Sequence, residues 1–415
     1  MRLSQLSENK KILILMIFPI SCLIMAFFVS DFNSIMKGLY KIIVHPDILI
    51  TDYIKIGGLG AALINSALLT LLNILILWKY KIRISGISIS AIFIIAGFSF
   101  FGKNIFNVWP IYLGGFLYAK YQKKSFKNIV IISMFGTALS PLVNEIAYGL
   151  KLPLSLGMPF AILAGALAGF VLPPISAHVL KAHEGYNLYN VGFAAGFIGT
   201  IAMSFMKSYG FSYSPRIILS SEYDMLLKIF LTLFFIILIV LGYYINGMSF
   251  KGYSNILWYS GRLITDFTHL VGFGLSLINM GIMGLIGMSY VIISNGTING
   301  PIIGGLLTMV GFASFGKHPK NCLPVMAGVF IAGLLKIWDT NSTTVIIAAL
   351  FGTSLAPVAG EYGIISGLFA GFLHLSVVMN VGVLHGGINL YNNGFSAGIV
   401  ATLLVPVIDA LKKEE

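Results

Sequence analysis

Apolar stretches follow one another along almost the whole chain, and this feature most constrains its fold. A helix needs about 20 apolar residues to cross the hydrocarbon core of a bilayer. The apolar segments are Ile12–Val29, Ile54–Trp78, Ile87–Phe101, Ile105–Ala119, Ile129–Gly149, Leu154–Leu180, Leu188–Met206, Leu226–Ile245, Phe267–Ile293, Ile298–Phe315, Leu323–Ile337, Thr344–Gly363, Ile364–Leu384 and Leu390–Ile408. Several are short or interrupted. The sequence therefore predicts an all-α, polytopic membrane protein with about 10–14 membrane segments, some of them broken or re-entrant.

Composition excludes most other classes of protein. Hydrophobic residues make up 57% of the chain and charged residues 10%, and the gaps between apolar segments are too short for a soluble domain. The net charge of +12 is spread over these short connections, so no nucleic-acid partner is expected. The first apolar run lacks a small-residue cleavage site, which favours a first spanning helix over a signal peptide. We expect an inner-membrane protein whose partners are lipids and a small solute.

The chain contains an internal repeat. The sequence from His183 to Gly196 returns from His385 to Gly398, 202 residues later, with ten of fourteen positions identical. Further matches pair Phe101-Gly-Lys103 with Phe315-Gly-Lys317, and Phe135-Gly-Thr-Ala-Leu-Ser-Pro141 with Phe351-Gly-Thr-Ser-Leu-Ala-Pro357. The repeat divides the chain into halves of roughly 1–210 and 211–415, with an insertion in the first half around 151–158. Internal repeats of this size in a membrane protein indicate transport.

Loop charge indicates how the halves are oriented. Basic residues fill two connections of the first half, at 79–83 and 120–127, which predicts that both are cytoplasmic. In the second half the basic residues lie instead in the alternate connection, at 317–320. This shift predicts inverted repeats, with parallel repeats as the alternative. Both termini, with Lys10, Lys11, Lys412 and Lys413, are then cytoplasmic.

A proline interrupts an apolar segment at the same place in each half. Pro141 and Pro357 have no amide hydrogen and are expected to end or kink a helix. Bare backbone groups are tolerated in a membrane only where protein or a water-filled cavity covers them, so paired breaks point to a binding site. Thr137 and Thr353, four residues earlier, are candidate ligands. A packing kink is the structural alternative.

One carboxylate follows each proline. Glu145 and Glu361 are paired by the repeat, and an ionisable group inside a membrane indicates a functional site. If they are buried, these residues are suited to carry a proton or a coupling cation. A position at a wet helix end is the alternative.

The most similar stretch places amides and imidazoles before a Gly-rich helix. Asn side chains there can cap the helix or contact a solute at its N-terminus, and the sequence weighs these roles equally. The histidines can change charge near neutral pH. The candidate residues of this stretch are His183, Asn187, Asn190, His385, Asn389 and Asn392.

Other paired polar residues have structural interpretations. Asp52 and Asp266 are expected at helix starts, and Asn65 and Asn279 are expected to form hydrogen bonds between helices. The lysines at the ends of the Phe-Gly-Lys motifs, Lys103 and Lys317, are expected to extend toward the membrane surface. Cys22 and Cys322 are far apart in sequence, and neither a metal-ligand cluster nor a cofactor is expected.

The repeated F-G-T-x-L-x-P and N-L-Y-N-x-G-F-x-A-G blocks resemble a family of bacterial multi-pass membrane proteins known as a domain of unknown function. The resemblance covers nearly the whole chain and implies no substrate. Gly185-Tyr-Asn187, before a Gly-rich segment, is faintly similar to urea channels, which also have inverted halves. Their Leu-Pro-x-x-Thr-x-Pro-Phe signature is absent here, so urea is not inferred.

The sequence as a whole predicts a secondary, ion-coupled transporter of a small polar or ionic solute, bound between the halves near the broken helices. A passive channel is one alternative. An intramembrane enzyme acting on a lipid-linked substrate is another, although the H-E-x-x-H and phosphate-loop motifs are absent. A scaffold subunit is a further alternative, and a homo-oligomer is compatible with the sequence.

Overall fold

The computed structural model describes residues 6–47, 50–211 and 216–411, and within these ranges the regular structure is helical. The elements of the first half are α1 (Glu8–Leu15), α2 (Ile17–Val29), α3 (Phe32–Val44), α4 (Tyr53–Gly57), α5 (Leu59–Lys79), α6 (Gly86–Phe98), α7 (Trp109–Tyr121), η1 (Phe126–Asn128), α8 (Val130–Gly136), η2 (Thr137–Leu139), α9 (Ser140–Asn144), η3 (Glu145–Gly149), α10 (Leu154–His183) and α11 (Asn190–Ser208). Lys412 and Lys413, which support a cytoplasmic C-terminus, lie outside the described residues.

The second half repeats this order of elements. It contains α12 (Asp224–Ile245), η4 (Tyr253–Trp258), α13 (Phe267–Leu270), α14 (Phe273–Ile293), α15 (Gly300–Phe312), α16 (Pro319–Leu335), α17 (Thr343–Gly352), η5 (Thr353–Leu355), α18 (Ala356–Tyr362), α19 (Ile364–Val381) and α20 (Asn392–Leu411). The insertion predicted in the first half corresponds to the greater length of α10, which has 30 residues where α19 has 18. The division at 210/211 stays a prediction, because residues 212–215 are outside the described ranges.

Ten helical segments of the described chain are long and apolar enough to cross a membrane. The predicted segments without such a span are Ile87–Phe101, Ile105–Ala119, Ile298–Phe315 and Leu323–Ile337, which fold as the shorter helices α6, α7, α15 and α16. At 1.5 Å per residue, the 13 residues of α6 or α15 extend only about 20 Å, against about 30 Å of hydrocarbon. The prediction that some membrane segments are short or broken is therefore confirmed.

Equivalent helices pack in equivalent ways within each half. In the first half, α2 packs against α5 and α7 against α10, and in the second half α12 packs against α14 and α16 against α19. Glycine allows the closest of these contacts. A Cβ atom on Gly114 of α7 would lie 2.0 Å from the carbonyl oxygen of Ala166, and a Cβ atom on Gly328 of α16 would lie 2.0 Å from that of Leu368.

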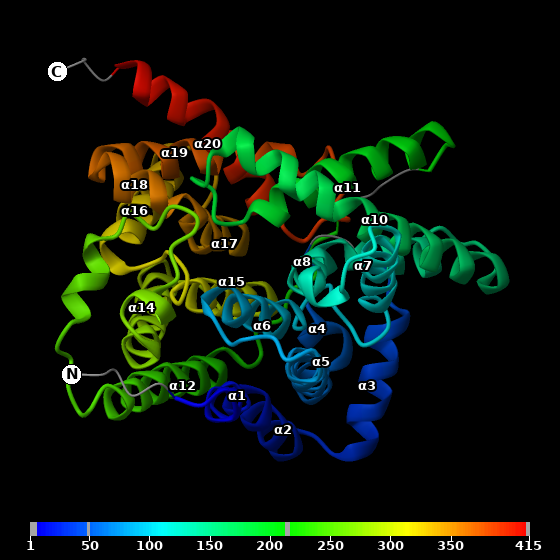
Figure 1. The fold of residues 1–415 in the computed structure, drawn as a ribbon. Helices are drawn as coiled ribbons and strands as arrows, with labels where there is room; N and C mark the ends of the chain where they lie inside the picture. Colours follow the sequence, from blue (N-terminus) through cyan, green and yellow to red (C-terminus); the bar gives the residue numbers. More distant parts are fainter. Residues whose placement is uncertain (1–5, 48–49, 212–215, 412–415) are drawn as a thin grey trace.

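The halves meet through two pairs of equivalent helices, α6 with α15 and α11 with α20. Figure 1 shows α6 and α15 side by side at the centre of the molecule. Gly192 of α11 faces Gly394 of α20, whereas Gly199, two turns later, lies against His385 and Asn389, which precede α20. The two helices are therefore antiparallel. Equivalent spans that run antiparallel are the arrangement of an inverted repeat.

Paired aspartates connect each half to the short central helix of the other. Asp52 is the N-cap of α4 and accepts the backbone N–H of Ile54, while its carboxylate also receives the N–H of Gly300, the first residue of α15. Asp266 caps α13 in the same way and accepts the N–H of Gly86, the first residue of α6. The helix-start prediction for both aspartates is confirmed, and each also caps a second helix across the interface.

Candidate functional site

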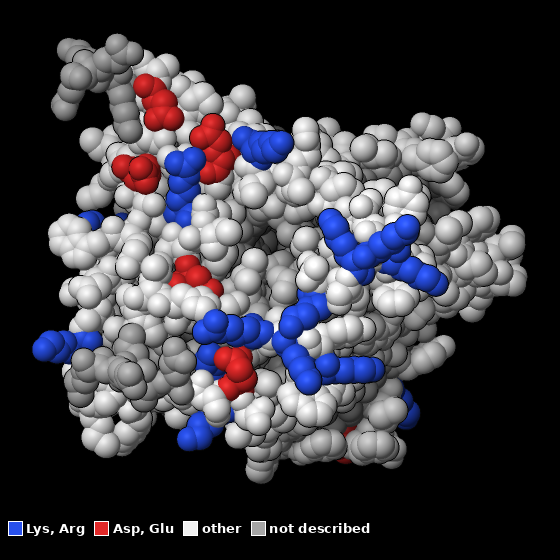
Figure 2. Space-filling model, in the orientation of Figure 1, with Lys and Arg blue, Asp and Glu red and all other residues white. Residues whose placement is uncertain are grey.

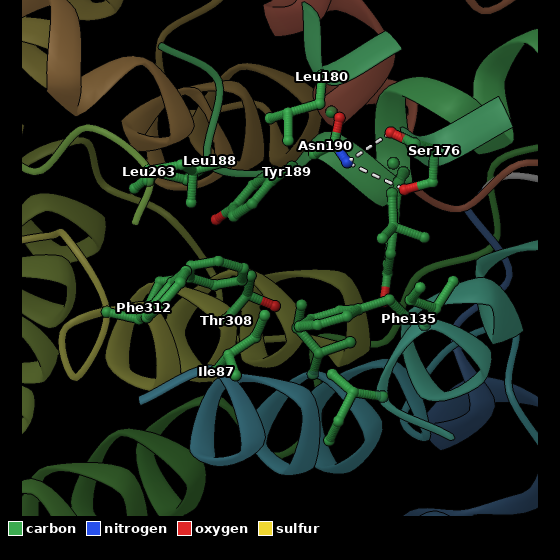
Figure 3. Close-up of a pocket in the computed structure, with 18 of the residues that line it drawn as sticks. Ile87, Phe135, Ser176, Leu180, Leu188, Tyr189, Asn190, Leu263, Thr308 and Phe312 are labelled. Atoms are coloured by element: carbon green, nitrogen blue, oxygen red, sulfur yellow. Dashed lines mark hydrogen bonds between the residues drawn. The ribbon is translucent and has the colours of Figure 1, made fainter. Parts of the chain in front are cut away.

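A cavity of about 300 Å³ lies between the two halves, at the centre of the molecule (Figure 3). Tyr189 and Asn190 lie on one side of it, and Thr308 and Phe312 lie on the opposite side. Its wall is mainly aliphatic and aromatic. The polar residues that line it are Ser176, Tyr189, Asn190, Thr308, Tyr391 and Asn393.

The predicted helix breaks are present on the two sides of this centre. In the first half, α8 ends in the 3₁₀ turn Thr137–Leu139, and α9 begins again with Pro141 in its first turn. In the second half, α17, the turn Thr353–Leu355 and α18 with Pro357 follow the same pattern. Proline cannot donate the backbone bond that would continue the preceding helix. Carbonyl groups at each break therefore need partners from elsewhere.

Those partners come from the opposite half. The backbone N–H of Leu188 donates to the carbonyl of Ser354 at 3.0 Å, and the N–H of Leu390 donates to the carbonyl of Ala138 at 3.0 Å. The Asn-Leu-Tyr-Asn segment of each half therefore forms a backbone hydrogen bond to the broken helix of the other half.

Hydrogen bonds within the motif fix its turn. The Oδ1 atom of Asn187 accepts the N–H of Tyr189 at 3.0 Å, and Asn389 does the same for Tyr391 at 3.0 Å. Such Asx turns are a common use of asparagine. The Nδ2 group of Asn187 donates to the carbonyl of Gly394. Neither asparagine caps the following helix, so the capping interpretation is replaced by a turn that presents a tyrosine.

The remaining residues of the motif join neighbouring helices. The Nε2 atom of His183 lies 3.0 Å from Asn190 Oδ1, and that of His385 lies 2.9 Å from Asn392 Oδ1. Asn190 Nδ2 donates to the carbonyl of Ser176 and Asn392 Nδ2 to that of Val378. α11 has no side-chain cap, so Asn190 is its first residue and not its cap. Asn190 is the member of this set that lines the cavity.

The structure overturns the expectation for the lysines of the Phe-Gly-Lys motifs. Lys103 and Lys317 are fully buried and do not extend to the membrane surface. Lys317 Nζ donates to the hydroxyl of Tyr189 at 2.6 Å and to that of Thr353 at 2.7 Å. Lys103 Nζ donates to the hydroxyl of Tyr391 at 3.1 Å. Each lysine therefore meets a cavity tyrosine of the opposite half.

The chain around each lysine explains this placement. Gly102 and Gly316 have φ of 85° and 94°, a left-handed conformation that turns the backbone after the short helix. The side-chain amide of Asn65 then donates to the carbonyls of Ser99 and Lys103, which holds the turn against α5. Asn279 repeats these bonds in the second half, as the predicted interhelical role requires. The pairing of both lysines in the repeat was the sequence signal for their role.

The two predicted carboxylates lie away from the cavity and in different environments. Glu145 starts the π-helical turn Glu145–Gly149 and is half-buried, and its Oε2 atom has no hydrogen-bond partner among the described residues. Glu361 is exposed near the end of α18. Of the predicted site residues, the structure brings Thr353 to Lys317 and Asn190 to the cavity, but it does not bring the two glutamates together.

A polar cluster near Glu145 was missed from the sequence. Asp47 is fully buried, and its Oδ2 atom accepts hydrogen bonds from Tyr53 (2.7 Å), Asn107 (3.2 Å) and Asn144 (2.9 Å). Burial raises the pKa of Asp47 well above its usual value, and the nearby Glu145 carboxylate raises it further. Asp47 has no counterpart in the repeat, so no pairing signal identified it.

Two repeats with antiparallel equivalent spans, broken helices and a cavity between them define a multi-pass membrane protein of the inverted-repeat class. The model of a family described as a protein of unknown function (DUF1576) matches residues 32–208 and 245–410, and the chain belongs to this family. The two matched segments correspond to the two halves. No curated protein and no solved structure matches the chain. The similarity to urea channels and a bacterial origin therefore stay predictions.

Proposed function

We propose that this protein is a secondary transporter that moves a small solute, bound in the cavity between its halves, by alternating access. In inverted-repeat transporters the binding site lies between the repeats, and the two halves exchange conformations to open it to one side and then the other. The observation that supports the proposal is that two first-half residues lining the cavity are at least partly exposed, whereas their equivalents in the second half are buried and do not line it.

Residues of the first half that line the cavity are open where their equivalents are closed. Ile132 of α8 is partly exposed, whereas its equivalent in α17, Ala348, is fully buried. Ile87 at the start of α6 is 38% exposed, whereas Pro301 at the start of α15 is buried. A nearly symmetric centre with one open side is the geometry expected of one state in an alternating cycle.

The open side lies next to the basic connections. Ile87 follows the segment 79–83, and Ile131 and Ile132 follow the segment 120–127, the two connections predicted to be cytoplasmic. Figure 2 shows a hollow near the centre of one face, with Lys and Arg side chains to the right of it and below it. Under this proposal the protein sits in the inner membrane with cytoplasmic termini and is open to the cytoplasm. It carries its solute chemically unchanged.

Transport measurements in proteoliposomes test the proposal. Vesicles are screened with radiolabelled amino acids, sugars, organic acids and inorganic ions under an imposed proton or sodium gradient. We expect one class of solute to accumulate against its own gradient, and Ile132→Trp, which fills the cavity, to abolish this uptake. Flux that only equilibrates would indicate a channel. Chemical change of a lipid-linked substrate by detergent-solubilised protein would indicate an enzyme.

A further inference from the structure

The two buried lysines have no carboxylate partner among the described residues. Ion pairs in these residues involve Lys11, Lys55, Lys228 and Arg262, and none involves Lys103 or Lys317. A buried cation without a counter-ion is costly, because water has been removed and no opposite charge replaces it. An anion bound near the lysines would therefore stabilise their protonated form.

The lysines are surrounded by neutral groups that suit a cation. Lys317 Nζ lies 4.5 Å from the ring centroid of Tyr189 and 5.3 Å from that of Phe312. Lys103 Nζ lies 5.0 Å from the Phe98 ring centroid and 5.1 Å from that of Tyr391. Ring faces and hydroxyl oxygens stabilise an ammonium only partly. The remaining positive potential is directed toward the cavity, because all four rings line it.

The hydroxyl groups of Tyr189 and Tyr391 lie between the lysines and the cavity, and a protonated lysine polarises them. Each accepts a hydrogen bond from a lysine Nζ, and each hydroxyl has one hydrogen of its own to donate. A hydroxyl polarised by a cation is a stronger donor, and it binds an anionic acceptor best. Tyr189 belongs to the first half and Tyr391 to the second, so both halves contribute one such donor to the same cavity.

The rest of the cavity wall is apolar and suits the apolar part of a ligand. Its wall carries Phe135, Phe351 and the aliphatic residues Ile94 and Ile131, and the described residues that line it include no Asp or Glu. A volume of about 300 Å³ is at the lower end for small-molecule sites, which are mostly apolar with a few placed polar groups. A cationic ligand would meet the two lysines without any compensating carboxylate.

We propose that the solute is a small organic anion, whose anionic group binds the hydroxyls of Tyr189 and Tyr391 in front of Lys317 and Lys103 and whose apolar part fills the aromatic cavity. This inference rests on the proposed transport function for its physiological meaning, but the binding site can be tested without transport. Lys317 has two hydroxyl partners and Lys103 has one. In an alternating cycle these roles exchange between the halves.

Three ligands of the same shape and different charge test the proposal. Benzoate, benzamide and benzamidine are titrated into the detergent-solubilised full chain by calorimetry, with hexanoate and chloride as further probes. We expect benzoate to bind at least tenfold more tightly than benzamide, and benzamidine not to bind. Equal affinity for benzoate and benzamide, or tighter binding of benzamidine, would overturn the proposal. Chloride binding as tight as that of benzoate and hexanoate would contradict the apolar part.

Conservative variants locate the site. Tyr189→Phe and Tyr391→Phe keep the ring, and Lys317→Met and Lys103→Met keep a long apolar side chain. Each should reduce benzoate affinity by tenfold or more. Tyr290→Phe is the matched control, because Tyr290 has a buried hydroxyl but does not line the cavity. Benzoate affinity that survives in all four variants would overturn the proposal.

The outcomes separate this inference from the transport proposal. Benzoate binding that depends on the tyrosines, without accumulation of any organic anion in proteoliposomes, would keep the site and refute transport. Accumulation of a neutral or cationic solute through the cavity would keep transport and refute the anion.

Discussion

The two halves of this protein are alike where they hold each other together and different where the cavity opens. The aspartate caps, the turns after α6 and α15, the lysine–tyrosine contacts and the bonds from each Asn-Leu-Tyr segment to the opposite helix break all occur twice. The exposure of Ile132 and Ala348 differs, and so does the environment of Glu145 and Glu361. Under the proposed function, the shared features form the scaffold and the binding site, and the differences reflect one conformation of the transport cycle.

A second difference concerns the residue three positions after the proline of each break. Asn144 reaches Asp47 and the carbonyls of Ile43 and His45, whereas its equivalent, Gly360, lets the backbone of Ser260 approach directly. A Cβ atom on Gly360 would lie 2.0 Å from the Ser260 carbonyl oxygen. The first half thus holds a buried carboxylate where the second half holds a main-chain contact. Among the described residues, a buried acid lies beside the glutamate of the first half and not beside that of the second. Under the proposed function, Asp47 and Glu145 are therefore the candidates for ion coupling.

The largest expected effect tests the shared scaffold. Gly114→Ala and Gly328→Ala each place a methyl group 2.0 Å from a backbone carbonyl oxygen of the partner helix, and we expect each to destabilise the protein by about 1–3 kcal/mol or more. The measurement is the midpoint of thermal unfolding in detergent. Gly382→Ala is the control, because its nearest contact is the Asn392 side chain at 3.5 Å. A clear loss in one half only would contradict the equivalence of the two helix crossings.

An effect of comparable size concerns the pH dependence of the cap across the interface. Burial raises the pKa of Asp52 to about 6, above its ordinary value of 3.8, so the folded state binds a proton more tightly than the unfolded chain does. Stability should therefore fall as pH rises from about 4 to about 6, by about 2–3 kcal/mol in total. Asp52→Asn should be less stable overall, because it loses capping bonds, but should have a flatter profile. Thermal midpoints from pH 4 to pH 7 measure both, and equal slopes would exclude this account of Asp52.

The smallest expected effect distinguishes the two glutamates by the pH or ion dependence of transport, with little change in stability. Glu145→Gln should shift the pH or ion dependence of transport, because Glu145 is half-buried beside Asp47, whereas Glu361→Gln should leave it unchanged, because Glu361 is exposed. Uptake rates from pH 5 to pH 8 provide the measurement. Unchanged profiles in both variants would make the two residues interfacial structure, and a shift with Glu361→Gln alone would reverse the comparison.

The sequence predicts much of this fold because duplication and hydropathy are properties of the chain itself. For that reason the sequence predicts the membrane spans, the helix breaks at Pro141 and Pro357, and the division into two halves. The burial of Lys103 and Lys317 was not predictable from hydropathy, because a lysine after an apolar segment looks the same whether the next loop reaches water or folds back between helices. Burial likewise distinguishes Glu145 from Glu361. The burial of a side chain depends on packing against residues distant in sequence, such as Asp47.

The central claim is that the cavity is exposed alternately to the two sides of the membrane. Single cysteines at the equivalent positions Ile132→Cys and Ala348→Cys test it most directly, because the native Cys22 and Cys322 are both buried. Each variant is labelled in membrane vesicles with an impermeant maleimide added from either side, with and without benzoate. We predict that position 132 reacts from the cytoplasmic side and position 348 from the opposite side, and that conditions that protect one expose the other. Simultaneous labelling of both positions under every condition, or complete protection of position 348 throughout, would contradict the claim.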